Sequence, residues 1–366
     1  MQENTITEDL NKELKCGGCG AYLTYAPGTR HLTCGYCGTK NEIVLPAVAI
    51  EELDFTTHAP LVIDQSQCQE LTLVKCTSCG AETTLLPHVT SSECPFCTTT
   101  LVLKDGGKKS VLKPKSLLPF KITAKEAFAK FGGWINSLWF APNDLKKYAT
   151  STEKMSGLYI PYWTFDCDTQ SAYSGEKGIN HYETYTTTEN GKPVQKTRVV
   201  TRWHSVSGEV YKTFDDVLVK ASRSLPDKYC RALEPWDLPQ LVPYDDKFLS
   251  GFKTESYQIG LEEGLETGKT IMAETIREVI CHDIGGDHQR IHSVNTAYAH
   301  ITFKHILLPV YISAYKYKGK IYRILVNGRT GEVQGERPYS WIKIAFAVLA
   351  GLALLSLFFY FTNYQT

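Results

Sequence analysis

The sequence has no net charge and no complete nucleotide-binding motif. Lysine plus arginine and aspartate plus glutamate number 39 each in 366 residues, so the formal net charge is zero. Proteins with an extended nucleic-acid surface normally carry a basic excess, so this balance argues against such a surface. Residues 264–270 resemble the end of a phosphate-binding loop, but Glu263 stands where the first glycine of that loop is required. An ATP-driven motor is therefore not expected.

The HExxH motif of zinc proteases is also missing. His288 and His292 are spaced to share a metal on one helix, together with Asp283 or Asp287, but Gln289 stands where that motif has glutamate. The two glycines before Asp287 indicate a loop. We expect the segment from residue 282 to residue 292 to be structural, and a hydrolase that uses these histidines is a minor alternative.

Residues 1–14 are polar and acidic and hold no apolar stretch of the secretory-signal type. We therefore expect the cysteines to lie in a reducing compartment, where stable disulfides are rare. The chain has 12 cysteines. Four scattered ones are expected to be ordinary buried thiols: Cys68, Cys167, Cys230 and Cys281.

The other eight cysteines form two copies of one pattern. Each copy has two Cys-x2-Cys pairs separated by fourteen residues, and each cysteine of the second copy lies sixty residues after its counterpart. Residues 15–21 also match residues 75–81, which indicates a tandem duplication. The two sets are Cys16, Cys19, Cys34 and Cys37, and then Cys76, Cys79, Cys94 and Cys97.

This spacing suits a tetrahedral metal site. Zn²⁺ takes four thiolates at about 2.3 Å, and a two-residue gap lets one tight turn present two sulfurs to the ion. We expect two small β zinc ribbons, each with one structural Zn²⁺ and four protein ligands, so that neither site is catalytic. A thioredoxin-like redox pair would need a strand-to-helix junction that this region lacks. Spacing alone does not separate zinc from a rubredoxin-type iron site.

The C-terminal region carries a long apolar run. Residues 344–361 are uncharged, which corresponds to about 27 Å of helix, close to the hydrocarbon thickness of a bilayer. We expect a transmembrane helix over residues 342–362 that binds the lipid bilayer, with Trp341 at one interface. Because Arg337 and Lys343 precede the span and no charge follows it, the positive-inside rule predicts a single-pass cell-membrane protein whose bulk is cytoplasmic.

The region between the ribbons and the span is expected to form an α+β domain with an antiparallel sheet, as one unit or as two lobes. A capping box from Thr123 to Glu126 begins a helix that runs to about residue 140. Gly132 and Gly133 inside it suggest close packing against another backbone, because glycine disfavours a helix interior. A second long helix is expected over residues 255–281. Strands are expected at residues 158–165, 182–188, 197–203, 209–214, 306–317 and 320–326, with a hairpin turn at Asn190 and Gly191.

The expected fold class is therefore multidomain: two tandem small β zinc ribbons, an α+β domain and one C-terminal transmembrane helix. The expected order is a polar tail at residues 1–14, ribbon 1 at 15–45, a linker with short strands at 46–73, ribbon 2 at 74–104, a linker at 105–113, the α+β domain at 114–337 and the span at 342–362.

The chain resembles a family of bacterial TFIIB-type double zinc-ribbon proteins with a C-terminal membrane anchor, often labelled primosomal N′ (replication-restart) helicase-like. The resemblance rests on the duplicated ribbons and covers nearly all of the chain. It implies a membrane docking role, with SPFH-like or phage-shock-type membrane-stress proteins as partners. The chain has no motor motifs that would support the helicase label. The other stretches that carry the family resemblance are residues 118–120, 132–135, 157–166, 214–219, 283–287 and 326–332.

Together these features predict a non-enzymatic, membrane-anchored and cytosol-facing scaffold or adaptor that recruits protein partners. The sequence identifies no small-molecule substrate. The alternative is a nucleic-acid-binding protein linked to replication restart, since zinc ribbons bind nucleic acid in other settings. Electrostatic attraction would be weak, because the acids in residues 1–45 slightly outnumber the basic residues there.

Overall fold

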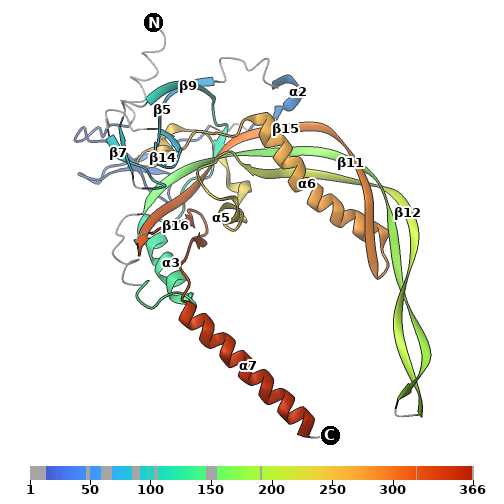
Figure 1. Ribbon diagram of the computed structural model, residues 1–366. Helices are drawn as coiled ribbons and strands as arrows, with labels where there is room; N and C mark the ends of the chain where they lie inside the picture. The colour runs from blue at the N-terminus through green and yellow to red at the C-terminus, as the bar shows by residue number, and fades with distance from the viewer. Residues whose placement is uncertain are drawn as a thin grey trace.

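The computed structural model describes residues 14–46, 50–58, 68–84, 91–97, 99–102, 106–145, 155–189, 192–318 and 320–364. A long arched sheet runs through the molecule (Figure 1). The two cysteine-bearing units lie at one end of the arch, a long β-hairpin extends from the other, and helix α7 projects away from the body. The expected polar tail lies outside the described residues except for Leu14.

The central sheet contains nine strands within the described ranges, with the order β12-β11-β15-β10-β13 along its main path. Most of its pairs are antiparallel, as predicted, but β10 runs parallel to β15 and β14 runs parallel to β11. Its strands are β4 (Leu53–Asp54), β10 (Ser116–Leu117), β11 (Ser156–Glu189), β12 (Lys192–Lys220), β13 (Val242–Pro243), β14 (Lys253–Thr254), β15 (His288–Tyr317), β16 (Lys320–Asn327) and β17 (Val333–Gly335).

Strands β11 and β12 form one continuous hairpin rather than the four shorter strands expected. Their register runs out to Glu189 opposite Lys192, which confirms the hairpin, while its two turn residues lie outside the described ranges. Gly175 and Gly208 do not break the strands but admit close neighbours. A Cβ on Gly208 would lie 2.7 Å from the Tyr173 hydroxyl, and one on Gly175 would lie 2.3 Å from the Arg290 carbonyl oxygen.

Helix α3 (Ala124–Ser137) begins with the predicted capping box, because the Thr123 side chain accepts from the Glu126 N–H and Glu126 accepts from the Thr123 N–H. The expected close packing at Gly132 and Gly133 is wrong. A Cβ added at either glycine meets no atom within 4 Å. Two further short helices are α2 (Phe55–His58) and α5 (Asp227–Arg231), with 3-10 turns at Leu238–Gln240 and Asp246–Leu249.

Helix α6 (Leu261–Ile284) lies along the central sheet and confirms the second long helix, although it begins six residues later than expected. Its glycines sit against the sheet. A Cβ on Gly264 would lie 2.8 Å from Trp163, and one on Gly268 would lie 3.2 Å from Phe165. The segment that resembles a phosphate loop is thus a helix whose glycines permit close contact with the sheet. Gly285, with a φ of +62°, ends the helix.

The two cysteine-bearing units have small sheets of their own. Ribbon 1 is the three-stranded sheet β1 (Leu23–Tyr25), β2 (His31–Cys34) and β3 (Lys40–Glu42). Ribbon 2 combines a sheet of β6 (Glu82–Thr84), β5 (Cys68–Lys75) and β9 (Gly106–Leu112) with a pair of β7 (Ser91–Glu93) and β8 (Thr100–Val102). Residues 106–112, expected as linker, form β9 instead, because the edge of β5 offers seven residues for pairing.

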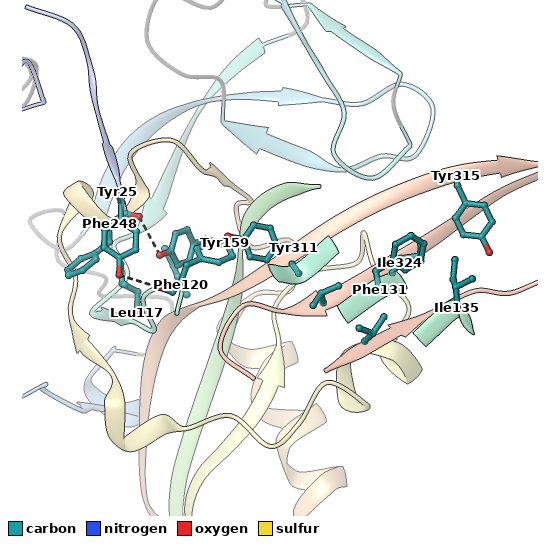
Figure 2. Close-up of a cluster of buried hydrophobic side chains, with 14 of the residues drawn as sticks. Tyr25, Leu117, Phe120, Phe131, Ile135, Tyr159, Phe248, Tyr311, Tyr315 and Ile324 are labelled. Atoms are coloured by element: carbon teal, nitrogen blue, oxygen red, sulfur yellow. Dashed lines mark hydrogen bonds between the residues drawn. The ribbon is translucent and has the colours of Figure 1, made fainter. Parts of the chain in front are cut away.

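Each ribbon shares a hydrophobic cluster with the body. Figure 2 shows Tyr25 of ribbon 1 beside Phe248, Phe120 and Tyr159, in a row of buried side chains that continues to α3. The Tyr25 hydroxyl donates to the Phe120 carbonyl at 3.2 Å. A second cluster joins ribbon 2 to the other side of the sheet, and a third lies under α6. The ribbons therefore pack on the body rather than hanging from it.

Helix α7 (Trp341–Tyr364) has the length and composition expected of a span. The most apolar 18-residue window of residues 341–362 has a mean hydropathy of 2.4, and none of that window is buried against the rest of the chain. A core helix of a soluble domain would be mostly buried. The exposed apolar surface confirms that one C-terminal helix is long and apolar enough to cross a bilayer.

Candidate metal centres

The structure brings the eight predicted cysteines together in two groups of four, in which the sulfurs lie within 4.8 Å of one another. In ribbon 1 the Sγ atoms of Cys16 and Cys37 are 3.4 Å apart, and those of Cys19 and Cys34 are 3.5 Å apart. Four thiolates around one ion at 2.3 Å would be separated by about 3.8 Å. The group therefore fits a tetrahedral metal ion.

Ribbon 2 repeats this geometry. The Sγ atoms of Cys76 and Cys97 are 3.5 Å apart, and those of Cys79 and Cys94 are 3.6 Å apart. In both ribbons the first cysteine of one pair faces the second cysteine of the other. The described cysteines are all free of disulfides, which agrees with ligation rather than cross-linking.

Glycines close the turns that present the sulfurs. Gly20, Gly38 and Gly80 have φ values of +74°, +73° and +75°, which L side chains rarely adopt. Each donates its N–H to the carbonyl oxygen of the first cysteine in its pair, at 2.8 to 3.0 Å. The duplicated residues thus build the same knuckle repeatedly, and the local sequence alone accounts for ligand placement.

The surroundings favour thiolates at several ligands of ribbon 1. The pKa values of Cys16 and Cys34 are lowered, chiefly by backbone hydrogen bonds from within their knuckles, and that of Cys37 is lowered chiefly by the Thr39 hydroxyl at 3.1 Å. Cys19 differs. Although a backbone hydrogen bond acts to lower its pKa, the hydrogen bonds it shares with neighbouring thiols raise the value to about 12.

Burial has more influence in ribbon 2. It raises the pKa of Cys79 to about 11 and raises that of Cys94 further. Burial also acts to raise the pKa of Cys97, but hydrogen bonds from Thr99 outweigh it and lower the pKa to about 6. A metal ion that binds this group must displace the protons of Cys79 and Cys94, so its affinity should increase with pH.

Ribbon 1 contacts the body through the strands between its knuckles. The Tyr25 N–H donates to the Ser250 carbonyl at 3.0 Å, and the Ser250 hydroxyl donates to the Leu23 carbonyl at 2.6 Å. The Tyr25 ring meets Phe248 edge-on, with 5.1 Å between centroids. The knuckles face away from this contact, so Cys19 and Cys37 are exposed.

Ribbon 2 contacts the body through a knuckle itself. Phe96, between Cys94 and Cys97, is fully buried, and the Arg323 guanidinium donates to its carbonyl oxygen at 3.1 Å. Thr83 of β6 forms a β-bridge with Glu255. Three of the four cysteines of this ribbon are buried and Cys79 is partly so.

The histidine-containing segment forms the end of α6 and the start of β15. Asp283, in the last turn of α6, accepts from the Tyr173 hydroxyl, and Asp287 accepts from the Asn180 N–H at 2.7 Å. His288 and His292 lie on strand β15, not on a helix, where a separation of four residues is about 13 Å. They therefore cannot share an ion, and no histidine belongs to a metal-type cluster within the described residues.

One acidic group was not anticipated from the sequence. Asp166, Asp215 and Asp216 lie within 4.8 Å of one another, where β11 has a bulge and Asp216 has a φ of +52°. The buried Lys304 ammonium lies 2.8 Å from Asp216 and 2.9 Å from Glu52. Burial raises the pKa of Asp166 to about 6. The Lys304 ammonium therefore offsets part of the acidic charge and links β15 to Asp216 of β12.

No protein family matches the chain, and no solved structure matches it. Among curated proteins, it is similar to "Uncharacterized protein YdjG" of Bacillus subtilis (strain 168), with 27% identity over 254 residues. The alignment spans 67% of this chain and 70% of that protein. That description assigns no activity, and the similarity supports no TFIIB-type or primosomal label.

Proposed function

We propose that this protein is a membrane-anchored scaffold in which two zinc-bound ribbons hold a rigid, cytosol-facing surface for protein partners. The observation that carries the proposal is the apolar helix α7, which leaves the folded body with none of its most apolar 18-residue window buried. A bilayer is the environment that such a helix matches in length. Arg337 and Lys343 on its N-terminal side favour a cytoplasmic body.

The cysteine groups support a structural role for the metal. A site with four protein thiolates has no open position for a substrate or water, so its ion holds the knuckles rather than acting in chemistry. Zinc is the ion we assign, because tetrahedral sets of four thiolates in small ribbons are typical of it. Elemental analysis of the purified chain should give two zinc ions per chain and no iron.

Ribbon 1 supplies the surface for partners. Its knuckle residue Tyr36 is 88% exposed, and Tyr22 and Val44 of the same ribbon are exposed as well. Exposed aromatic side chains on a rigid support are frequent anchors of protein–protein interfaces. The chemistry favours a partner with an apolar surface. The resemblance to anchored zinc-ribbon proteins, which implies membrane-stress partners, makes SPFH-like or phage-shock-type proteins the first partners to test.

The test is a crosslinked affinity purification of the full-length chain from membranes, compared with Tyr36→Ser and with the matched control Tyr182→Ser on the hairpin. We expect the same membrane-stress proteins with the wild type and the control, and at least a tenfold loss with Tyr36→Ser, which corresponds to about 1.4 kcal/mol of binding free energy. Recovery of replication proteins that nuclease treatment abolishes would instead favour the nucleic-acid function.

A further inference from the structure

The start of α7 is fastened to the end of α3, although about 200 residues separate them in the chain. The Ser340 N–H donates to the Phe140 carbonyl at 2.7 Å. The Lys343 ammonium donates to the carbonyl oxygens of Trp139 at 3.0 Å and of Ala141 at 2.8 Å. The first turn of the apolar helix and residues 139–141 therefore form one junction, which we call the α3–α7 junction.

The α3–α7 junction carries large aromatic side chains that the protein leaves uncovered. Trp139 is 79% exposed and Phe140 is 42% exposed, and their rings are stacked with centroids 6.5 Å apart. Tyr339 and Trp341, at the start of α7, are exposed as well. Clustered exposed aromatics on a folded protein usually mark a surface that another body covers.

The surrounding chemistry fits the interfacial layer of a bilayer. Tryptophan and tyrosine prefer that layer, because their rings are apolar and their N–H or O–H groups reach water and headgroups. Lys343 extends its ammonium away from the apolar part of α7 toward the body, as lysines at the ends of membrane helices do. The segment from Leu138 to Asn143 contains no charged residue that would oppose insertion.

We propose that Trp139 and Phe140 are a second membrane contact, inserted at the lipid interface beside α7. This inference rests on the membrane anchoring in the proposed function. A helix that enters a bilayer alone leaves the attached domain free to turn, whereas two contacts held by the α3–α7 junction fix the angle between body and membrane. The ligand is the bilayer interface itself, with no requirement for one headgroup.

The test uses the full-length chain reconstituted in vesicles whose lipids carry bromine near the glycerol end of the acyl chains, because bromine quenches tryptophan emission on contact. Wild type is compared with Trp139→Phe, Trp341→Phe and the matched control Trp203→Phe, which lies on the hairpin. Zinc content and circular dichroism confirm that each variant is folded. All three positions accept phenylalanine, since none is buried in the core.

We expect the quenched emission to fall by about half in Trp139→Phe and by a similar amount in Trp341→Phe, because two interfacial tryptophans supply it. Trp203→Phe should leave the quenched emission unchanged. A loss in Trp341→Phe without any loss in Trp139→Phe would overturn the second contact while leaving the anchor intact. The same result would be obtained if a protein partner or a second copy of the chain, rather than lipid, covered Trp139. Absence of quenching in every form would instead show that α7 is not inserted, so that the proposed function fails.

Discussion

The two ribbons have the same ligands and nearly the same knuckles, but they attach to the body by different surfaces. Tyr36 and Phe96 are equivalent residues, sixty positions apart. Tyr36 is 88% exposed, whereas Phe96 is 0% exposed and lies in a core cluster with residues of the sheet. Duplication therefore preserved the metal geometry, which depends on local spacing. Docking depends on the residues between the ligands, and these have diverged.

The difference separates two tasks that a zinc ribbon can perform. In ribbon 2 the knuckle that holds Phe96 packs on the body, so this cysteine group lies at a buried contact between ribbon and sheet. In ribbon 1 the strands make the joint, through Leu23 and Tyr25, and the knuckle remains available. An ancestral knuckle that docked on a protein surface would explain both, with the surface supplied by the same chain in one case and by another protein in the second.

The largest expected difference is in stability. Phe96→Ala should lower the free energy of unfolding of ribbon 2 by about 3–5 kcal/mol, because it removes a fully buried ring and leaves a cavity. Tyr36→Ala should change stability by no more than about 0.5 kcal/mol, because the ring has little to lose. Hydrogen exchange of β7 and β8 in the full-length chain, followed in urea, measures the first effect, and the same measurement on β1 and β2 measures the second. Equal losses of unfolding free energy in the two variants would contradict the difference in burial between the two knuckles.

A second contrast lies in the pH dependence of docking. The Glu255 side chain is buried beside ribbon 2 and accepts from the Ser222 hydroxyl at 2.9 Å, while its Oε2 has no hydrogen-bond partner in the described structure. Burial raises its pKa from 4.5 to about 7, although both Ser222 and Ser224 act to lower it. Lys220 also acts to lower it.

Because the pKa in the folded state is the higher one, the stabilisation by the protonated carboxyl is complete below about pH 4.5 and is lost as the pH rises to about 7. Hydrogen exchange of ribbon 2, corrected for intrinsic rates, should therefore be faster at pH 7.5 than at pH 5.5. The change should correspond to about 1–3 kcal/mol, the usual cost of an unpaired buried polar group. Glu255→Gln should remove it, and the exposed control Glu263→Gln should not. No change in the wild type would show that Glu255 keeps one charge state throughout.

The smallest expected contrast is kinetic. Both ions should be held tightly, but a chelator should remove the ion of ribbon 1 at least tenfold faster, which corresponds to about 1.4 kcal/mol in the barrier. The reason is access, since Cys19 and Cys37 are exposed and only Cys79 is partly open in ribbon 2. Biphasic release of zinc to a coloured chelator, with the fast phase missing in Cys37→Ser, would confirm the order. A single phase would contradict it.

The sequence predicted the parts of the molecule that local chemistry determines. The spacing of the cysteines and the glycines that follow them predicted both cysteine groups. The length of the uncharged apolar run predicted α7, and the Thr123 capping box predicted the start of α3. Each of these depends on residues that are neighbours in the chain. The long hairpin was predicted at its tip for the same reason.

Features that depend on distant residues were missed. In the sequence, Gly175 and Gly208 resemble strand ends. Only the folded sheet shows that these glycines leave space for Arg290 and Tyr173. The acidic group at Asp166 required β11 and β12 to pair at a bulge, and no spacing rule connects Asp166 with Asp215 and Asp216. Nor does anything in the knuckle sequences reveal which of Tyr36 and Phe96 is buried, because the receiving surface lies more than 200 residues away at Arg323.

In the membrane-anchored arrangement proposed above, the outer part of the hairpin would limit how far the body can tilt. Pairing with β15 ends at Gly178, so the last eleven residue pairs form a two-stranded arm of about 36 Å. In Figure 1 this arm and α7 descend on the same side of the arch. The arm has unpaired edges and four cationic residues between positions 192 and 202, three of which pair with Glu183 or Glu189. Hydrocarbon therefore excludes the arm, and its remaining positive charge suits anionic headgroups. If the body tilted on α7 towards the arm, the contact between the arm and the headgroups would stop the tilt.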